Sequence, residues 1–108
     1  MNIQNTAALF DALSSPVRLN VLLALVDAGK AGMVAGEIAT QVDVTPTNLS
    51  FHLRALTRSG LIDVFKEGRF LRYRANFGLA AALIDDLVER VGRPAARLSR
   101  SSGRKTKK

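Results

Sequence analysis

The 108-residue sequence has no cysteine, a single histidine and only three prolines. Without cysteine there can be no disulfide, no thiolate metal site, no thiol nucleophile and no thiol redox sensor. No apolar run approaches the roughly 18 to 20 residues that span a bilayer, and residues 1–11 lack the basic start and apolar stretch of a signal peptide. We therefore expect a soluble, cytoplasmic protein without membrane contact.

Length and composition predict one small globular domain, since 47% of the residues are apolar. The sequence also contains no glycine-rich phosphate loop, no nucleophile motif and no paired-acid pattern. These absences predict that the protein is not an enzyme and that it needs no cofactor.

The net charge of +7 comes entirely from the C-terminal end. Residues 1–92 carry equal numbers of basic and acidic side chains, whereas residues 93–108 carry seven Lys and Arg and no acid. We expect a domain at residues 1–92 and a disordered basic tail that either binds polyanions or only favours solubility. Within the domain, residues 45–75 have a net charge of +4 and the remainder −4. This polarity indicates that one face meets an anion such as a nucleic acid.

Apolar residues recur at helical spacing in five segments. The predicted helices cover residues 3–13 and 17–28, a short segment from Val34, a segment that Thr45 and Pro46 begin, and a segment that Asn76 caps. Residues 17–28 are apolar on nearly every side, so we expect the central buried helix there. Over residues 61–66 and 69–74 the period changes to about 2, which predicts a β-hairpin with its tip at Glu67-Gly68.

The third and fourth predicted helices form a helix-turn-helix. In the fourth helix Leu49, Leu53 and Leu56 share the face that we expect to be buried. A DNA major groove, about 12 Å wide, admits one helix whose outward side chains reach the base edges, and a hairpin can lie along the adjacent phosphates as a wing. The outward residues of this helix are Thr47, Asn48, Ser50, Phe51, Arg54 and Arg58, and Lys66 and Arg69 flank the hairpin tip.

Three blocks, at residues 10–25 (FDALSSPVRLNVLLAL), 36–62 (GEIATQVDVTPTNLSFHLRALTRSGLI) and 66–75 (KEGRFLRYRA), resemble the ArsR/SmtB family of winged-helix bacterial transcriptional repressors. The resemblance implies a mostly α fold with a β-hairpin wing (α+β). It also implies a homodimer that represses a nearby operon by binding an imperfect palindrome in double-stranded DNA. It carries over Thr47, Asn48, Ser50, Phe51 and Arg54 as recognition-helix residues and Lys66, Arg69 and Arg72 as wing residues. Thr45, Arg58 and His52 complete the predicted DNA-binding set; for His52 a structural or DNA-backbone role is favoured over catalysis because no nucleophile or orienting acid accompanies it.

The same resemblance places the first and last helices at a dimer interface. A second argument for a dimer does not depend on the resemblance. The first and last helices each carry an apolar stripe that a small domain cannot fully bury, which favours pairing with a second copy across a two-fold axis. The alternative is that both stripes pack on the core of their own chain. The predicted interface residues are Ile3, Phe10, Leu79, Leu83, Leu87 and Val91.

The effector stays open. Val34 and Gly36 occupy the positions that match the family's metal-binding cysteine pair, and neither side chain ligates a metal. Asp85, Asp86 and Glu89 form an all-oxygen cation site across a dimer, are simply the solvated face of the last helix, or pair with Arg90, Arg93 or the tail and so compete with DNA for the basic arm. We therefore predict no metal site. The alternative functions are a winged-helix module that binds protein and a nonspecific nucleic-acid binder that uses the basic tail.

Overall fold

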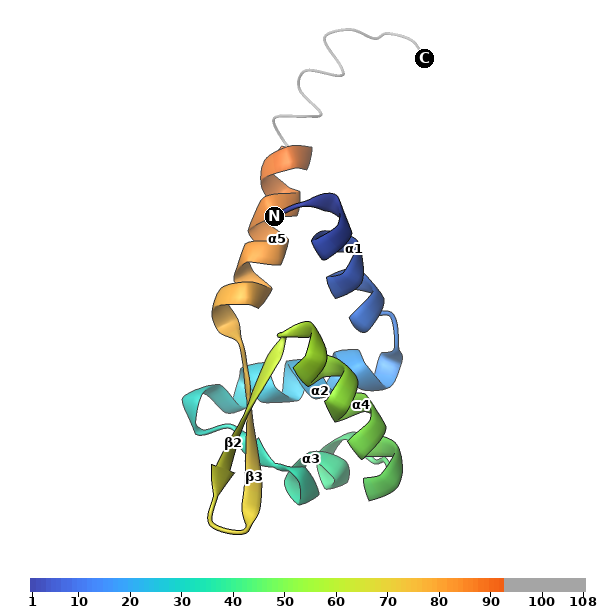
Figure 1. The fold of residues 1–108 in the computed structure, drawn as a ribbon, viewed down its shortest axis with the longest axis vertical. Helices are drawn as coiled ribbons and strands as arrows, with labels where there is room; N and C mark the ends of the chain where they lie inside the picture. The colour runs from blue at the N-terminus through green and yellow to red at the C-terminus, as the bar shows by residue number, and fades with distance from the viewer. Residues whose placement is uncertain (93–108) are drawn as a thin grey trace, which may run out of the picture.

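The computed structural model describes residues 1–92, which fold into five α-helices, one 3-10 turn and a three-stranded sheet. The order is α1 (Ile3–Ala12), α2 (Pro16–Ala28), η1 (Gly29–Ala31), β1 (Met33–Val34), α3 (Ala35–Val42), α4 (Pro46–Ser59), β2 (Ile62–Glu67), β3 (Phe70–Ala75) and α5 (Phe77–Val91). Helices α2, α3 and α4 and the sheet form the body of the domain, and α1 and α5 extend from one side of it (Figure 1). The predicted mostly α fold with a hairpin wing is confirmed. The predicted basic tail, residues 93–108, lies outside the described residues.

Side-chain caps explain why the last two helices begin where the sequence predicts. The Thr45 hydroxyl accepts a hydrogen bond from the Asn48 backbone N–H at 3.2 Å, so α4 begins at the next residue, Pro46. The Asn76 side chain accepts from the Leu79 backbone N–H at 3.1 Å and begins α5. Its amide group also donates to the Gly60 carbonyl at 3.0 Å, which ties the start of α5 to the end of α4.

The core lies between α2, α3, α4 and the sheet. Its fully buried large side chains are Val21, Leu25, Ile38, Leu49, Leu56, Leu61, Ile62 and Leu83. Helix α2 contributes only one side to this core, since Leu19, Leu23 and Val26 are exposed. The prediction of a helix buried on every side is therefore wrong, because so small a domain has too few elements to cover a whole helix.

The sheet has the strand order β1-β3-β2, and both of its pairings are antiparallel. Strand β1, which sequence analysis did not predict, pairs Met33 with Tyr73. Gly32 makes this approach possible: its φ is 63°, and a Cβ atom there would collide with the Tyr73 carbonyl oxygen. Tyr73 packs against the core, whereas Phe70 is 59% exposed.

The hairpin tip lies one residue later than predicted. Because Glu67 pairs with Phe70, the two turn residues are Gly68 and Arg69. Gly68 has a φ of 62°, and the first position of a two-residue hairpin turn with a single positive φ favours glycine. Arg69 therefore projects from the tip itself.

Helices α1 and α5 carry exposed apolar side chains. Ile3, Phe10, Leu87 and Val91 are all at least 40% exposed, whereas Leu79 is half-buried and Leu83 is only 1% exposed. The α5 stripe is thus divided, with Leu83 in the core of its own chain and the later residues on the surface.

Within residues 1–92 no single helix has the length and apolar composition to cross a membrane; α1 and α2 meet those criteria together, as a pair bent by 94°.

Candidate nucleic-acid interface

Helix α4 has one buried and one exposed face. Leu49, Leu53 and Leu56 are at most 3% exposed, as predicted, and pack into the core. The opposite side is exposed to solvent along the whole helix. Its exposed residues are Thr47, Asn48, Ser50, Phe51, Arg54 and Arg58, preceded by Thr45 and Pro46. The structure therefore brings together, on one accessible surface, every α4 residue predicted to reach DNA except His52.

His52 is half-buried beside this surface, and its ring is held from two sides. The Phe51 ring meets it in a T-shaped contact with centroids 5.4 Å apart. Its Nδ1 lies 3.2 Å from Nη1 of Arg18, and Arg18 Nε donates to the Ala12 carbonyl at 2.6 Å. A guanidinium group has donors only, so Nδ1 is the acceptor. Sequence reasoning missed Arg18, whose one visible signal is that it is the only basic residue in a mostly apolar helix.

The two faces of the hairpin have different surroundings. Paired residues share a face, so Lys66 and Leu71 lie on the same face as Val64 and Tyr73. That face looks toward α4, because Val64, Leu71 and Tyr73 line a groove of about 380 Å³ with Ser50, Leu53, Arg54 and Thr57. Burial raises the pKa of the Tyr73 phenol above its ordinary value of 10.0, so the phenol is uncharged at neutral pH.

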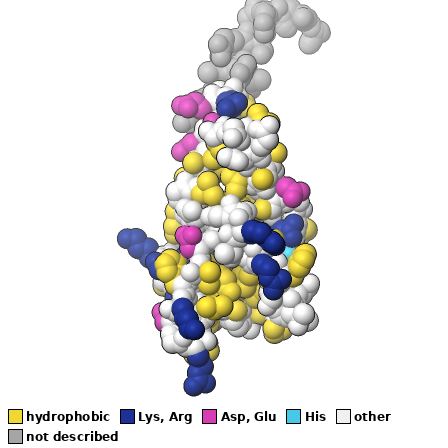
Figure 2. Space-filling view, viewed as in Figure 1, with side chains coloured by type: hydrophobic (Ala, Val, Ile, Leu, Met, Phe, Trp, Pro, Cys, Tyr) yellow, Lys and Arg dark blue, Asp and Glu magenta, His cyan; other side chains and the backbone are white. Residues whose placement is uncertain are grey.

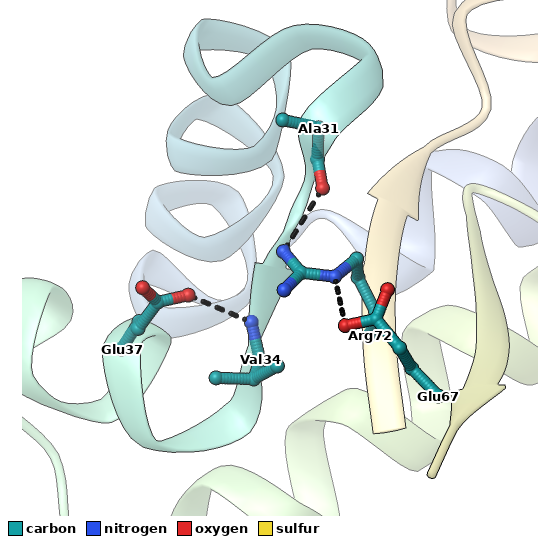
Figure 3. A network of polar contacts seen from close by, with 5 residues as sticks. All are labelled: Ala31, Val34, Glu37, Glu67 and Arg72. Atoms are coloured by element: carbon teal, nitrogen blue, oxygen red, sulfur yellow. Dashed lines mark hydrogen bonds and ion pairs between the residues drawn. The ribbon is translucent and has the colours of Figure 1, made fainter. Parts of the chain in front are cut away.

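Arg72 lies on the other face and is already bound within the chain (Figure 3). Its Nε forms an ion pair with Glu67 at 3.0 Å, and its Nη1 donates to the Ala31 carbonyl at 3.0 Å. It therefore joins the hairpin to the η1 turn. Nearby, the Glu37 carboxylate accepts from the Val34 backbone N–H at 3.0 Å and holds the start of α3. Two of the Arg72 donors are thus used within the chain, and its assignment to the DNA-binding surface stays a prediction.

On the view of Figure 2, basic side chains lie over α4 and along the hairpin, with an apolar surface between these two groups, and others project at the left edge and near the top. Arg54 and Arg58 on α4 and Lys66 and Arg69 on the hairpin are all exposed. Arg74, by contrast, lies on the Arg72 face with its guanidinium carbon 3.8 Å from the centre of the Phe65 ring. Four cations per chain are thus free to meet an anion on the side that includes α4.

The acidic residues of α5 are exposed or half-buried on the helix surface. Asp86 pairs with Arg90 at 3.5 Å, one turn along the helix. Among residues 1–92, no three His, Asp or Glu side chains lie close enough together to hold a metal ion within one chain.

A helix-turn-helix with an exposed polar second helix, followed by a hairpin beside it, defines a winged helix-turn-helix domain. Comparison with known families agrees: the helix-turn-helix domain family matches residues 13–64. The HTH-type transcriptional regulator CmtR of Mycobacterium tuberculosis is 34% identical over 83 residues, which are 77% of this chain and 68% of CmtR. YdfF of Bacillus subtilis, another HTH-type transcriptional regulator, is 38% identical over 86 residues, but these are 78% of this chain and only 36% of YdfF.

Solved structures give the same result. An ArsR-like transcriptional regulator from Rhodococcus sp. RHA1 superposes with a TM-score of 0.69 and 32% identity, covering 90% of this chain and 85% of that one. The homodimeric winged helix-turn-helix DNA-binding domain Mb0332 from Mycobacterium bovis, described as a possible ArsR-family regulator, gives a TM-score of 0.63 and 26% identity over 82% of this chain and 85% of that one. The chain belongs to the ArsR family of DNA-binding transcriptional regulators.

Proposed function

We propose that the protein is a homodimeric, sequence-specific repressor that inserts α4 into the major groove of an operator and lays the hairpin along the neighbouring phosphates. The observation that carries this proposal is the division of α4, whose leucine face is buried while its polar and basic face is exposed from end to end. Such a helix satisfies the geometry of major-groove reading. Because the proposed work is done on chromosomal DNA, the proposal includes a cytoplasmic location.

The site residues fall into two roles in this proposal. Polar residues on α4 contact base edges, and cations contact phosphates. The base-reading candidates are Thr47, Asn48, Ser50, Phe51 and Arg54, with Thr45 at the helix start; Arg58, Lys66 and Arg69 are the phosphate candidates. Arg72 is not included, since two of its donors, on Nε and Nη1, already serve Glu67 and Ala31.

A homodimer is supported by the exposed apolar side chains of α1 and α5, which extend from the same side of the body (Figure 1). The homodimeric state of Mb0332 supports the same assembly. Two copies related by a two-fold axis would place two α4 helices on half-sites about one helical turn apart, so the operator is an imperfect palindrome. Replacing Leu87 with Glu tests this assembly: in sedimentation, the wild type runs as a dimer and the variant as a monomer. A monomeric wild type at micromolar concentration contradicts it.

The decisive experiment is a footprint of the purified protein on DNA upstream of its own gene, repeated over a range of salt concentrations. The three phosphate candidates per chain give about six phosphate contacts per dimer, and hence a slope of log affinity against log salt of roughly −5. We expect a palindromic footprint with a Kd of about 10⁻⁸ to 10⁻¹¹ M. Arg54→Ala should weaken binding, with Lys30→Ala as the matched control, since Lys30 is an exposed cation outside this surface.

Other results of the same experiment identify the alternatives. Equal affinity for every DNA sequence contradicts the repressor and indicates a nonspecific binder that uses the basic tail. No DNA binding at all indicates a module that binds protein. The proposal assigns no enzymatic step and no resident cofactor. Repeating the footprint with zinc, with arsenite and with a chelator identifies an ionic effector if one of them removes the protected region.

A further inference from the structure

Phe51 is the only Phe, Tyr or Trp of α4, and it lies on the exposed face of the helix. Its side chain is 59% exposed among Thr47, Asn48, Ser50 and Arg54, which are all polar or charged. The core does not use this ring, because the buried face of α4 is made of leucines. An exposed apolar ring on this face suggests that Phe51 contacts the DNA that the proposed repressor binds.

The Phe51 ring is in contact with a side chain that the fold holds in place. It rests against His52 with an angle of 74° between the ring planes. His52 is fixed by Arg18, which donates both to its Nδ1 and to the Ala12 carbonyl. Two donors of one planar guanidinium group are thereby used on two different elements, which fixes its orientation. The sequence of contacts runs from the end of α1 through α2 to the outward face of α4.

A fixed apolar ring on a recognition helix has one chemical counterpart on the base edges of a major groove. Donors and acceptors line that groove, and the single apolar group is the C5-methyl of thymine. We propose that Phe51 contacts the 5-methyl group of a thymine in each operator half-site, and that Arg18 and His52 are positioning residues that hold its ring for this contact. This inference rests on the proposed function and specifies which base part of α4 reads.

The test replaces each thymine of the footprinted operator in turn with deoxyuridine, which pairs identically and lacks only the methyl group. At one thymine of each half-site, we expect binding of the full-length protein to weaken about fourfold, as for one methyl group returned to water. Phe51→Ala should bind the thymine and deoxyuridine operators equally. Phe70→Ala is the matched control, because it removes a phenyl ring of the same 59% exposure from the Arg72 face of the hairpin, outside α4, and should leave the discrimination intact.

The positioning roles are tested by the same ratio of affinities. Arg18→Ala should bring the thymine-to-deoxyuridine ratio toward one without changing the salt slope, because Arg18 contacts no phosphate in this proposal. Arg18→Lys should restore part of the ratio. If Arg18→Ala does not fold, as judged by circular dichroism, His52→Ala removes the ring contact and leaves the Arg18 bond to Ala12 in place.

Two kinds of failure are distinguishable. A palindromic footprint that is insensitive to every deoxyuridine, or discrimination that survives Phe51→Ala, overturns this inference and leaves the repressor intact. Discrimination that survives both Arg18→Ala and His52→Ala overturns the positioning roles. Absence of any sequence-specific footprint overturns the proposed function and this inference with it.

Discussion

Replacing Arg72 with Ala tests whether this cation belongs to the fold or to the DNA-binding surface. Its side chain is 30% exposed, and Glu67, its ion-pair partner, is 59% exposed. A pair so open to solvent contributes about 0.2 to 1 kcal/mol, and the hydrogen bond to the Ala31 carbonyl contributes about 1 kcal/mol more. The expected loss of stability is therefore about 1 to 2 kcal/mol, which corresponds to a fall in Tm of roughly 5 to 15 °C for a domain of this size.

The assay combines thermal unfolding with DNA binding over a range of salt concentrations. Arg72→Ala should lower Tm and leave the salt slope unchanged, because no phosphate contact is lost. Arg69→Ala, at the exposed hairpin tip, should do the opposite: an unchanged Tm and a slope less steep by about 0.9 for each phosphate contact removed. The reasoning is refuted if Arg72→Ala keeps its Tm and reduces the slope as Arg69→Ala does.

Three further predictions concern the fold and the tail. Gly32→Ala should lower stability in urea unfolding more than Gly29→Ala does, because both glycines have positive φ but only a Cβ at Gly32 meets the β3 backbone; equal losses would contradict this. Thr45→Ala should cost about 1 kcal/mol in the same assay by removing the cap of α4, and an unchanged midpoint would show that the cap is dispensable. Removing residues 93–108 should lower nonspecific DNA affinity and its salt dependence, and no change in either would exclude the tail from DNA binding.

The elements that the sequence predicts well are those whose limits are set by neighbouring residues. Thr45 and Asn76 cap helices through bonds to residues three positions away, so the starts of α4 and α5 can be predicted from local sequence. Strand β1 has only two residues and therefore no period to detect. It exists because Gly32 allows the chain to approach β3, about 40 positions further along the sequence.

Sequence reasoning did not foresee two contacts at the candidate site, those of Arg72 and of Arg18, and both have the same physical cause. Arg72 matches a wing position in sequence, yet its bond to Ala31 joins residues 41 positions apart. Arg18 lies 34 positions from His52, and nothing near either residue indicates that they meet. Contacts between distant residues decide whether a cation supports the fold or remains free for a ligand, and such contacts leave no periodic pattern in the sequence.

The charge of residues 1–92 sums to zero, so attraction by net charge cannot account for DNA binding by this domain. The arrangement of the charges must do so. Arg54, Arg58, Lys66 and Arg69 are exposed at α4 and the hairpin, while Asp85, Asp86 and Glu89 lie on α5. DNA attracts such a domain when α4 and the hairpin face it, and repels the domain when the acidic residues of α5 face it. Tail removal should therefore weaken binding to all DNA while leaving the preference for the operator over random sequence, because that preference depends on the contacts that α4 makes once it is correctly oriented.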